Sequence, residues 1–306
     1  MLDEALTGIA AVPGGIYVDA TYGRGGHSGA ILGRLGDSGR LLALDRDPEA
    51  ARDARARFGG RANFAFHAAP FASLAEVCAK AGVTGRVNGV LFDLGVSSPQ
   101  LDDAARGFSL AKDGPLDMRM DPGAGPAAAE WLARAGEREI ADVLWRYGEE
   151  RNSRRIARAV LDERARSPIT TTTQLAELVL SVHRGPRQKI HPATRTFQAI
   201  RIYLNQELEQ LAQALEQAVA VLAPAGRLVA ISFHSLEDRI VKRFIRDRAR
   251  GAAPSASAGD RKSFSMTPAD APALDRIGKA QFPTDAEAAA NPRARSAVLR
   301  VAERRP

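Results

Sequence analysis

The sequence has very little cysteine and no long hydrophobic run. Cys78 is its only cysteine, which excludes a disulfide framework and any metal site built on cysteine ligands. This thiol lies in the apolar helical pattern at 74–79, so we expect it to be buried and inert. Without a run of eighteen apolar residues or a signal peptide, we expect a soluble, cytoplasmic protein that does not enter membranes. Since no His, Asp or Glu residues recur at a metal-ligand spacing, we expect no metal ion.

The chain is basic, and its positive charge is concentrated in one segment. Its 306 residues, enough for one large or two ordinary domains, carry a net charge of +7. Residues 104–204 contain 17 Arg and Lys against 12 Asp and Glu, which accounts for +5 of that total. An arginine-rich proteome would also give a basic chain, but this concentration of charge favours a polyanionic partner.

A glycine-rich turn follows the first apolar run. The run at 16–22 leads into the turn at 23–28 (G-R-G-G-H-S) and then into a helical pattern, which is the opening of a doubly wound α/β domain. The glycines let the backbone approach a ligand, and the helix would direct its free N–H groups at that ligand. The dinucleotide pattern G-x-G-x-x-G lacks its last glycine here. The turn therefore favours S-adenosylmethionine over a nicotinamide dinucleotide, and a turn without a ligand is a third interpretation.

Two acids near this turn support the same preference. Asp45 ends the second apolar run, about twenty residues after the glycines, where it would accept both hydroxyls of a ribose. Asp19 lies just before the turn, where it would repel a diphosphate but attract the ammonium group of S-adenosylmethionine.

Five apolar runs predict strands, and the long interval before the last one predicts an inserted unit. The runs lie at 16–22, 40–46, 63–68, 87–94 and 227–233. Helical patterns join the first four, so these strands should be parallel. Roughly 130 residues precede the fifth strand, where a crossover needs only about a dozen. We therefore predict an α/β, Rossmann-like sheet domain from residues 1–103 and 205–306, with an inserted all-helical domain at 104–204.

Other elements follow from the same patterns. We predict a single long helix at 193–222, a helix at 235–248 and a mobile loop at 251–272, which is rich in Ala, Ser, Pro and Gly. Residues 295–302 predict a last strand at an antiparallel edge of the sheet.

The loop after the fourth strand begins with an acid. Asp93 ends that strand in the crevice where ligands bind, and Ser97, Ser98 and Pro99 would form a rigid rim. Asp93 would accept a bond from an exocyclic amino group on adenine or on a substrate. An ordinary Asx-type turn explains the same residues, and the two interpretations stand equal on this segment alone.

Three further segments offer groups for an RNA partner. Residues 107–122 predict either a lid, with Phe108 to stack on a base and Arg119 to pair with a phosphate, or a hinge. The helix expected at 150–164 has an arginine stripe that is either a phosphate contact or a solvated face: Arg151, Arg154, Arg155 and Arg158. The helix start with His191 and Arg195 is a candidate anion site.

One histidine is a candidate proton carrier. His234 follows the fifth strand, where it would face the ligand crevice. We expect Ser235, with Asp238, to cap the helix that begins there.

Taken together, these segments resemble the ribosomal small-subunit RNA methyltransferase H family, also called MraW. The resemblance covers nearly the whole chain: 17–28, 44–49, 92–103, 107–122, 147–159, 191–201, 231–244 and 291–304. It implies S-adenosylmethionine-dependent N4-methylation of a cytidine in the decoding centre, the P-site region, of 16S rRNA. It also implies a Rossmann-like methyltransferase domain whose helical insert recognises the substrate. Members of that family usually carry a short stretch, with a histidine and Pro-Val, before the point at which this sequence begins.

The resemblance also implies site residues and partners. The family's cofactor contacts fall on Gly25, Gly26, His27, Asp45, Phe71, Asp93 and Gln100. We add three candidate catalytic residues, namely Asp93, Ser98 and His234. The expected partner is rRNA within the assembled or nearly assembled 30S subunit, and a homodimer is left open.

Three rival functions also fit the sequence. The first is a DNA or transfer-RNA amino-methyltransferase on the same scaffold. The second is an NAD-dependent oxidoreductase, which cofactor titration would detect. The third is a non-catalytic RNA-binding assembly factor, which would bind subunits but transfer no methyl group.

Overall fold

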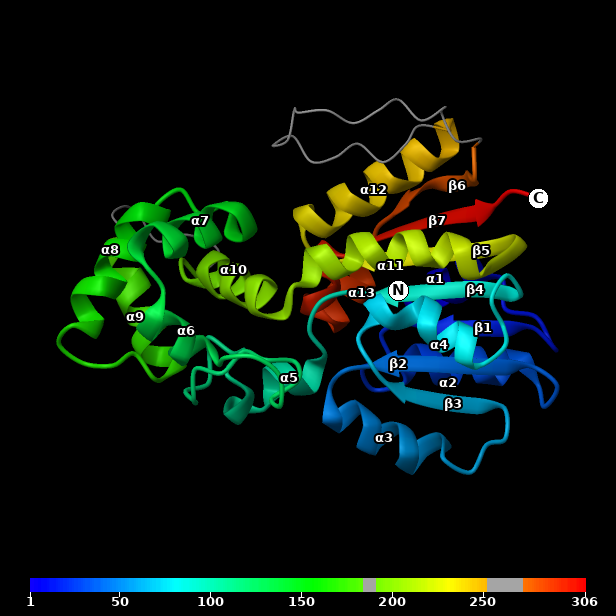
Figure 1. Cartoon of the computed structure of the whole chain (residues 1–306), viewed down its shortest axis with the longest axis horizontal. Helices are drawn as coiled ribbons and strands as arrows, with labels where there is room; N and C mark the ends of the chain where they lie inside the picture. The colour runs from blue at the N-terminus through cyan, green and yellow to red at the C-terminus, as the bar shows by residue number, and fades with distance from the viewer. Residues whose placement is uncertain (184–190, 252–271) are drawn as a thin grey trace. The chain divides into compact units, whose positions relative to one another are not determined.

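The protein contains two compact units, one built around a sheet and one built from helices (Figure 1). The computed structural model describes residues 1–183, 191–251 and 272–306. The sheet unit contains residues 1–95 and 208–306, and the helical unit contains residues 96–207.

The sheet unit is built on one seven-stranded sheet in the order β3-β2-β1-β4-β5-β7-β6. Its strands are β1 (Ile16–Asp19), β2 (Arg40–Asp45), β3 (Phe64–Ala68), β4 (Val87–Asp93), β5 (Leu222–Ser232), β6 (Leu274–Gln281) and β7 (Val298–Arg304). The first four are parallel, as predicted, β5 is parallel to them as well, and β7 pairs antiparallel with both β5 and β6.

Helices cover both faces of this sheet, which makes it doubly wound. One face carries α1 (Leu2–Ile9), α2 (Gly26–Leu35) and α3 (Pro48–Phe58). The other carries α4 (Leu74–Lys80), α11 (Glu207–Val221) and α12 (Ser235–Arg250). The near-continuous apolar runs of the central strands are explained by this burial on both sides. Within the described residues, no helix combines the length and apolar character needed to cross a membrane.

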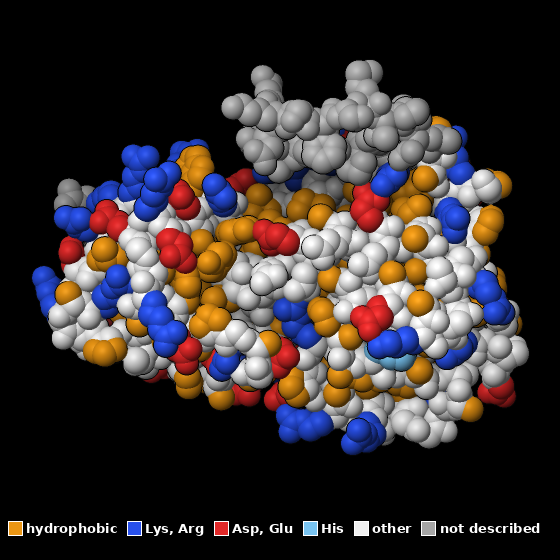
Figure 2. All heavy atoms as spheres, viewed as in Figure 1, with side chains coloured by type: hydrophobic (Ala, Val, Ile, Leu, Met, Phe, Trp, Pro, Cys, Tyr) orange, Lys and Arg blue, Asp and Glu red, His pale blue; other side chains and the backbone are white. Residues whose placement is uncertain are grey.

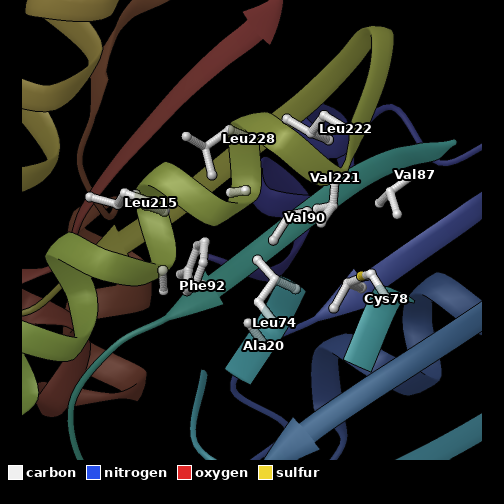
Figure 3. Packing of buried hydrophobic residues seen from close by; sticks show 14 of the residues in the cluster. Ala20, Leu74, Cys78, Val87, Val90, Phe92, Leu215, Val221, Leu222 and Leu228 are labelled. Carbon is white, nitrogen blue, oxygen red and sulfur yellow. The ribbon is translucent and has the colours of Figure 1, made fainter. Parts of the chain in front are cut away.

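The core on the α4 and α11 side includes the one cysteine. Cys78 on α4 is fully buried and points, with Leu74, toward the β4 side chains Val90 and Phe92 (Figure 3). Burial raises the pKa of the Cys78 thiol to about 11, so the thiolate is scarce at neutral pH. The buried, inert cysteine expected from the sequence is confirmed.

The helical unit has a core of its own. Its helices are α5 (Ser98–Asp102), α6 (Ala128–Arg134), α7 (Glu137–Gly148), α8 (Ser153–Arg164), α9 (Thr172–Val182) and α10 (Thr194–Asn205). Leu144, Ile156 and Ile200, from α7, α8 and α10, are fully buried together. The unit begins at Val96, earlier than the position expected from the sequence, because Val96 and Leu101 pack against this core.

Several element predictions were wrong. The long helix expected at 193–222 is two helices, since Gln206 adopts a left-handed conformation (φ 51°) between α10 and α11. The sequence analysis missed β6, and β7 is consequently not the edge of the sheet. Most of the loop expected at 251–272 lies outside the described residues.

The sheet unit also contains three short elements, the third of which is the 3-10 turn η3 (Pro292–Ser296). A 3-10 turn, η1 (Phe71–Ser73), follows β3, and α13 (Asp285–Ala290) follows β6.

Candidate functional site

Acids end three neighbouring parallel strands of the sheet unit. Asp19 is the last residue of β1, Asp45 of β2 and Asp93 of β4. Strand β1 lies between the other two and pairs with both, so all three side chains lie at the same edge of the sheet. The carboxyl edge of parallel strands is where α/β proteins bind ligands.

The glycine turn is held above this edge by backbone contacts. Tyr22 donates its N–H to the Leu44 carbonyl (2.9 Å), and Gly25 donates to the Tyr22 carbonyl (2.8 Å). Gly25 has φ +65°, and a Cβ there would lie 2.5 Å from the Tyr22 hydroxyl. Gly26, the first residue of α2, is different, because a Cβ there meets no protein atom within 4 Å. The start of α2 is therefore open at Gly26.

Both carboxylate oxygens of Asp45 accept backbone hydrogen bonds, one of them from the glycine turn. Its Oδ2 accepts from the Gly23 N–H (2.8 Å) and its Oδ1 from the Asp47 N–H (2.9 Å). Burial raises the pKa of Asp45 to about 6, although these two bonds favour the charged form. Each oxygen keeps one lone pair, so the carboxylate can still accept two hydroxyl donors.

The carboxylate of Asp19 is buried and hydrogen-bonded within the protein. The side chain is fully buried, and it accepts from the Ser28 hydroxyl (2.6 Å) and the Thr21 N–H (3.2 Å). Burial raises the pKa of this carboxyl, and the Ser28 bond opposes the rise. Direct pairing with a ligand ammonium, considered from the sequence, does not fit this burial.

His27 and Asp93 form a pair at the same edge. Nδ1 of His27 lies 3.3 Å from Oδ2 of Asp93. Burial lowers the pKa of His27, but the bond to Asp93 and the charges of Asp93 and Asp19 outweigh it, so the pKa lies above its ordinary value. Nε2 of His27 and Oδ1 of Asp93 are both buried and have no hydrogen-bond partner among the described residues. Buried polar atoms are almost always paired, so these two need partners from a bound molecule or water.

Neighbouring side chains fix the pair and add an apolar wall. The Thr21 hydroxyl accepts from the Asp93 N–H (2.6 Å), which ties the β1 turn to the end of β4. Phe71 is partly buried and packs edge-to-face on Phe92, with ring centroids 6.2 Å apart. Thr21 was not predicted from the sequence, although a hydroxyl between a strand-end acid and a glycine turn indicates a hydrogen bond at the strand end.

Two predicted site residues belong to the helical unit. Gln100 is buried, and its Oε1 accepts from the Ser97 N–H (2.9 Å), so its side chain caps α5. Ser98 is the exposed first residue of α5.

The cap predicted for α12 was wrong. His234 itself is the N-cap, and its Nδ1 accepts from the Glu237 N–H (3.4 Å). Its Nε2 lies 3.1 Å from Oε1 of Glu237. Asp238 pairs with Arg300 instead of capping (2.7 Å). Nδ1 of His234 is thus engaged in its own helix turn, whereas Nε2 is buried and has no hydrogen-bond partner in the described part of the chain.

The predicted lid does not present its two key groups. Phe108 is only 7% exposed and lies in the core of the helical unit, so it cannot stack on a base. Arg119 donates through Nε and Nη2 to Asp117 (2.8 and 2.7 Å) and through Nη1 to the Gly125 carbonyl (3.1 Å). The stacking role of Phe108 is therefore corrected, whereas a phosphate contact of Arg119 stays a prediction, made less favourable by these bonds.

The arginine stripe is smaller than expected. Helix α8 begins at Ser153, so Arg151 precedes the helix rather than lying on it. Arg158 pairs with Glu137 (2.8 Å), and Arg155 donates to the Val182 carbonyl (3.0 Å). Arg151 and Arg154 are exposed and have no partner in the described part of the chain. Figure 2 shows basic and acidic side chains interspersed over the helices of this unit.

The predicted anion site at the start of α10 has two residues with local roles. Nδ1 of His191 accepts from the Ala193 N–H (3.2 Å), and Arg195 donates to the Glu149 carbonyl (3.4 Å). Both side chains are exposed. In the described ranges, no group of three or more His, Cys, Asp or Glu side chains is arranged to hold a metal ion.

Comparison with known proteins assigns the chain to a family. The model of the MraW methylase family matches residues 1–305. The chain belongs to this family. It is 55% identical to the ribosomal RNA small subunit methyltransferase H of Thioalkalivibrio sulfidiphilus, over 99% of this chain and 96% of that protein. It is 53% identical to the protein of that name from Xanthomonas oryzae pv. oryzae, over 98% of this chain and 86% of the relative.

The family assignment confirms the resemblance that the sequence motifs indicated. The α/β sheet expected from the strand and turn patterns is confirmed as well.

Proposed function

We propose that the protein transfers a methyl group from S-adenosylmethionine to the N4 amino group of a cytidine in the decoding centre of small-subunit rRNA. The observation that carries this proposal is the His27–Asp93 pair, which leaves Oδ1 of Asp93 and Nε2 of His27 buried and unpaired beside an open helix start. Membership of a methylase family supports the reaction type, and the names of the relatives support the RNA substrate.

The residues at the sheet edge fit this cofactor. Asp45 would accept the two ribose hydroxyls, since each of its oxygens keeps a lone pair. The open start of α2 at Gly26 would receive the methionine carboxylate, because free N–H groups and the helix dipole favour an anion there. Phe71 would cover the adenine ring, and Gln100 is a further proposed contact on the helical unit. A bound cofactor supplies an electrophilic methyl group on a sulfonium.

The amino group of the substrate must be made more nucleophilic and must be positioned. The lone pair of cytidine N4 is delocalised into the ring, so the amine is a weak nucleophile. An acceptor for its N–H bonds favours the pyramidal, reactive form, and the enzyme must hold N4 in line with the methyl group. We assign the acceptor role to Oδ1 of Asp93, a buried carboxylate oxygen that no described residue contacts by a hydrogen bond. His27 would orient this carboxylate, because its Nδ1 lies 3.3 Å from Oδ2 of Asp93 and leaves Oδ1 to the substrate.

The roles of Ser98 and His234 in proton transfer remain proposals. Ser98 is exposed, whereas His234 is buried and offers only Nε2, because its Nδ1 caps α12. For RNA contact we favour Arg151 and Arg154 over Arg155 and Arg158, whose guanidinium groups already have protein partners. His191 and Arg195 remain proposed phosphate contacts.

A pair of Gly→Ala variants in α2 tests the cofactor orientation. Gly26→Ala should weaken S-adenosylmethionine binding at least tenfold, because the new methyl group occupies the open helix start. Gly33→Ala is the matched control, since its Cβ also meets no protein atom within 4 Å and it lies in the same helix. Calorimetric titration measures both affinities. Equal affinities for the two variants would remove the cofactor carboxylate from this helix start.

The affinity for the cofactor should depend on pH through Asp45. The ribose hydroxyls need an ionised acceptor, and the pKa of Asp45 is raised to about 6. Binding should therefore be strongest above pH 6 and weaken as the pH falls through 6. Asp45→Asn should bind weakly at every pH and lose this inflection. An inflection that survives in Asp45→Asn belongs to another group, such as His27.

Methyl-transfer assays separate the proposal from its rivals. Radiolabelled S-adenosylmethionine is offered with small ribosomal subunits, free small-subunit rRNA, transfer RNA and DNA. We expect label in small subunits or their rRNA alone. Label in transfer RNA or DNA supports the first rival function, and binding of subunits without transfer supports an assembly factor.

A further inference from the structure

A basic groove lies in the sheet unit, outside the site described above. It is formed by α12, β6 and β7 and has a volume of about 490 Å³. Half of its twelve lining side chains are cationic and none is acidic; the cations are Lys242, Arg246, Arg250, Arg276, Lys279 and Arg300. Three different elements contribute these charges, so they converge on one concave space rather than spreading along one solvated helix face.

Nearby acids neutralise only part of this charge. Arg300 pairs with Asp238 through two bonds (2.7 and 3.1 Å), and Arg246 pairs with Asp247 (2.7 Å). The remaining four cations have no ion pair or hydrogen bond within the described ranges: Lys242, Arg250, Arg276 and Lys279. Asp275, the acid on β6, pairs with Arg305 outside the groove lining (2.7 Å). The groove is therefore strongly positive.

An irregular part of β6, residues 278–280, lines the groove. This strand is the edge of the sheet, so one side has no neighbouring strand among the described elements. Its ladder with β7 also shifts register between Ile277 and Gln281, which leaves 278–280 out of the paired rows. Gly278 adopts φ +66° within this bulge. Backbone N–H groups freed in this way bind phosphate oxygens well.

An exposed aromatic side chain lies at the end of the groove nearest the sheet's carboxyl edge. Phe282 follows β6 directly and is 65% exposed. Gln281, the residue before it, lies in one cross-strand row with Leu299, Ile231 and Asp93. Three strand spacings separate the ends of this row, which is roughly 14 Å. An extended polymer bound along the groove would therefore run toward Asp93.

We propose that this groove binds the phosphate backbone of rRNA next to the target cytidine, and that Phe282 stacks on a flanking base. The proposal rests on the proposed function and extends its RNA surface from the helical unit to the sheet unit. Proteins bind single-stranded nucleic acid with cationic side chains along its phosphate backbone and with aromatic side chains that stack on its bases. A concave groove suits a strand better than it suits a flat lipid surface.

The test compares two double charge reversals. Arg276→Glu with Lys279→Glu changes the groove, whereas Arg55→Glu with Arg61→Glu makes the same change in net charge at two exposed sheet-unit arginines without partners in the described residues. The probe is small subunits from cells that lack the gene, and the dissociation constant is measured over a range of salt concentrations. The groove variant should weaken binding at least tenfold and reduce the salt slope by about 1 or more, since fewer counterions are released. The control variant should match the wild type, and both should bind S-adenosylmethionine normally.

A third variant separates stacking from charge. Phe282→Ala should weaken subunit binding about fivefold or more without changing the salt slope, because stacking releases no counterions. The groove proposal is overturned if the wild type methylates subunits while the groove variant keeps its affinity and slope. It is also overturned if that variant loses only the binding of phosphatidylserine vesicles. A wild type that transfers no methyl group to subunits contradicts the proposed function instead, whatever the groove variant does.

Discussion

Replacing Asp45 by alanine should weaken S-adenosylmethionine binding about 10- to 100-fold. The substitution removes a carboxylate that would accept two ribose hydroxyls, and hydrogen bonds to a charged group contribute roughly 1.5–3 kcal/mol. It also frees the N–H of Gly23, which the carboxylate holds at 2.8 Å, so the glycine turn loses a tether. Calorimetric titration with S-adenosylmethionine measures the effect directly.

A second ligand and a second variant make this result specific. Methionine alone has no ribose, so its weak competition should change little between the wild type and Asp45→Ala. Asp53→Asn is a useful control, because Asp53 accepts from the Tyr22 hydroxyl (2.7 Å) and also supports the turn without facing a ribose. If Asp53→Asn lowers the affinity as much as Asp45→Ala, Asp45 acts only through the shape of the turn.

Replacing Asp93 by asparagine should lower the methyl-transfer rate at saturating cofactor tenfold or more. The variant keeps the shape of the side chain but removes the charge that would accept an N4–H bond as the amine becomes reactive. It also weakens the pair with His27, whose Nδ1 lies 3.3 Å from Oδ2 of Asp93, because an amide carries no charge. We expect a loss of cofactor affinity in addition, since the resemblance implies a cofactor contact here.

The division between the two losses is measurable. Single-turnover rates at saturating S-adenosylmethionine report the chemical step, and the dissociation constant reports binding. A variant with weaker binding but a full rate would restrict Asp93 to holding the cofactor. His27→Asn is the informative companion, because it removes the imidazole but leaves the Asp93 carboxylate in place.

The part of the site that the sequence predicts well is local. Asp45 and Asp93 each end an apolar strand, and parallel strands bring such ends to one edge, so their shared location follows from the pattern. The glycine turn is likewise readable from the sequence as a cluster of glycines. The structure gives the reason for one of them, because only a residue without Cβ fits against Tyr22 at Gly25. The burial of Asp19 beneath Ser28 could not be predicted in the same way, since it depends on how α2 packs.

The features that sequence patterns missed depend on tertiary contacts. The break between α10 and α11 has no Gly or Pro to mark it. Instead, Asn205 accepts from the Met120 N–H and donates to the Met118 carbonyl, both at 2.8 Å, which anchors the end of α10 to a distant loop. Strand β6 was missed because its side chains are mostly exposed at the sheet edge and show no apolar alternation. Phe108 gave an aromatic signal for RNA, but the core of the helical unit buries it.

The measurement that tests the central claim most directly is mass spectrometry of small-subunit rRNA from cells with and without the gene. The account predicts N4-methylation of one decoding-centre cytidine in cells that have the gene, its loss without the gene, and its return with the wild type but much less with Asp93→Asn. An identical set of methylated cytidines with and without the gene would contradict the account.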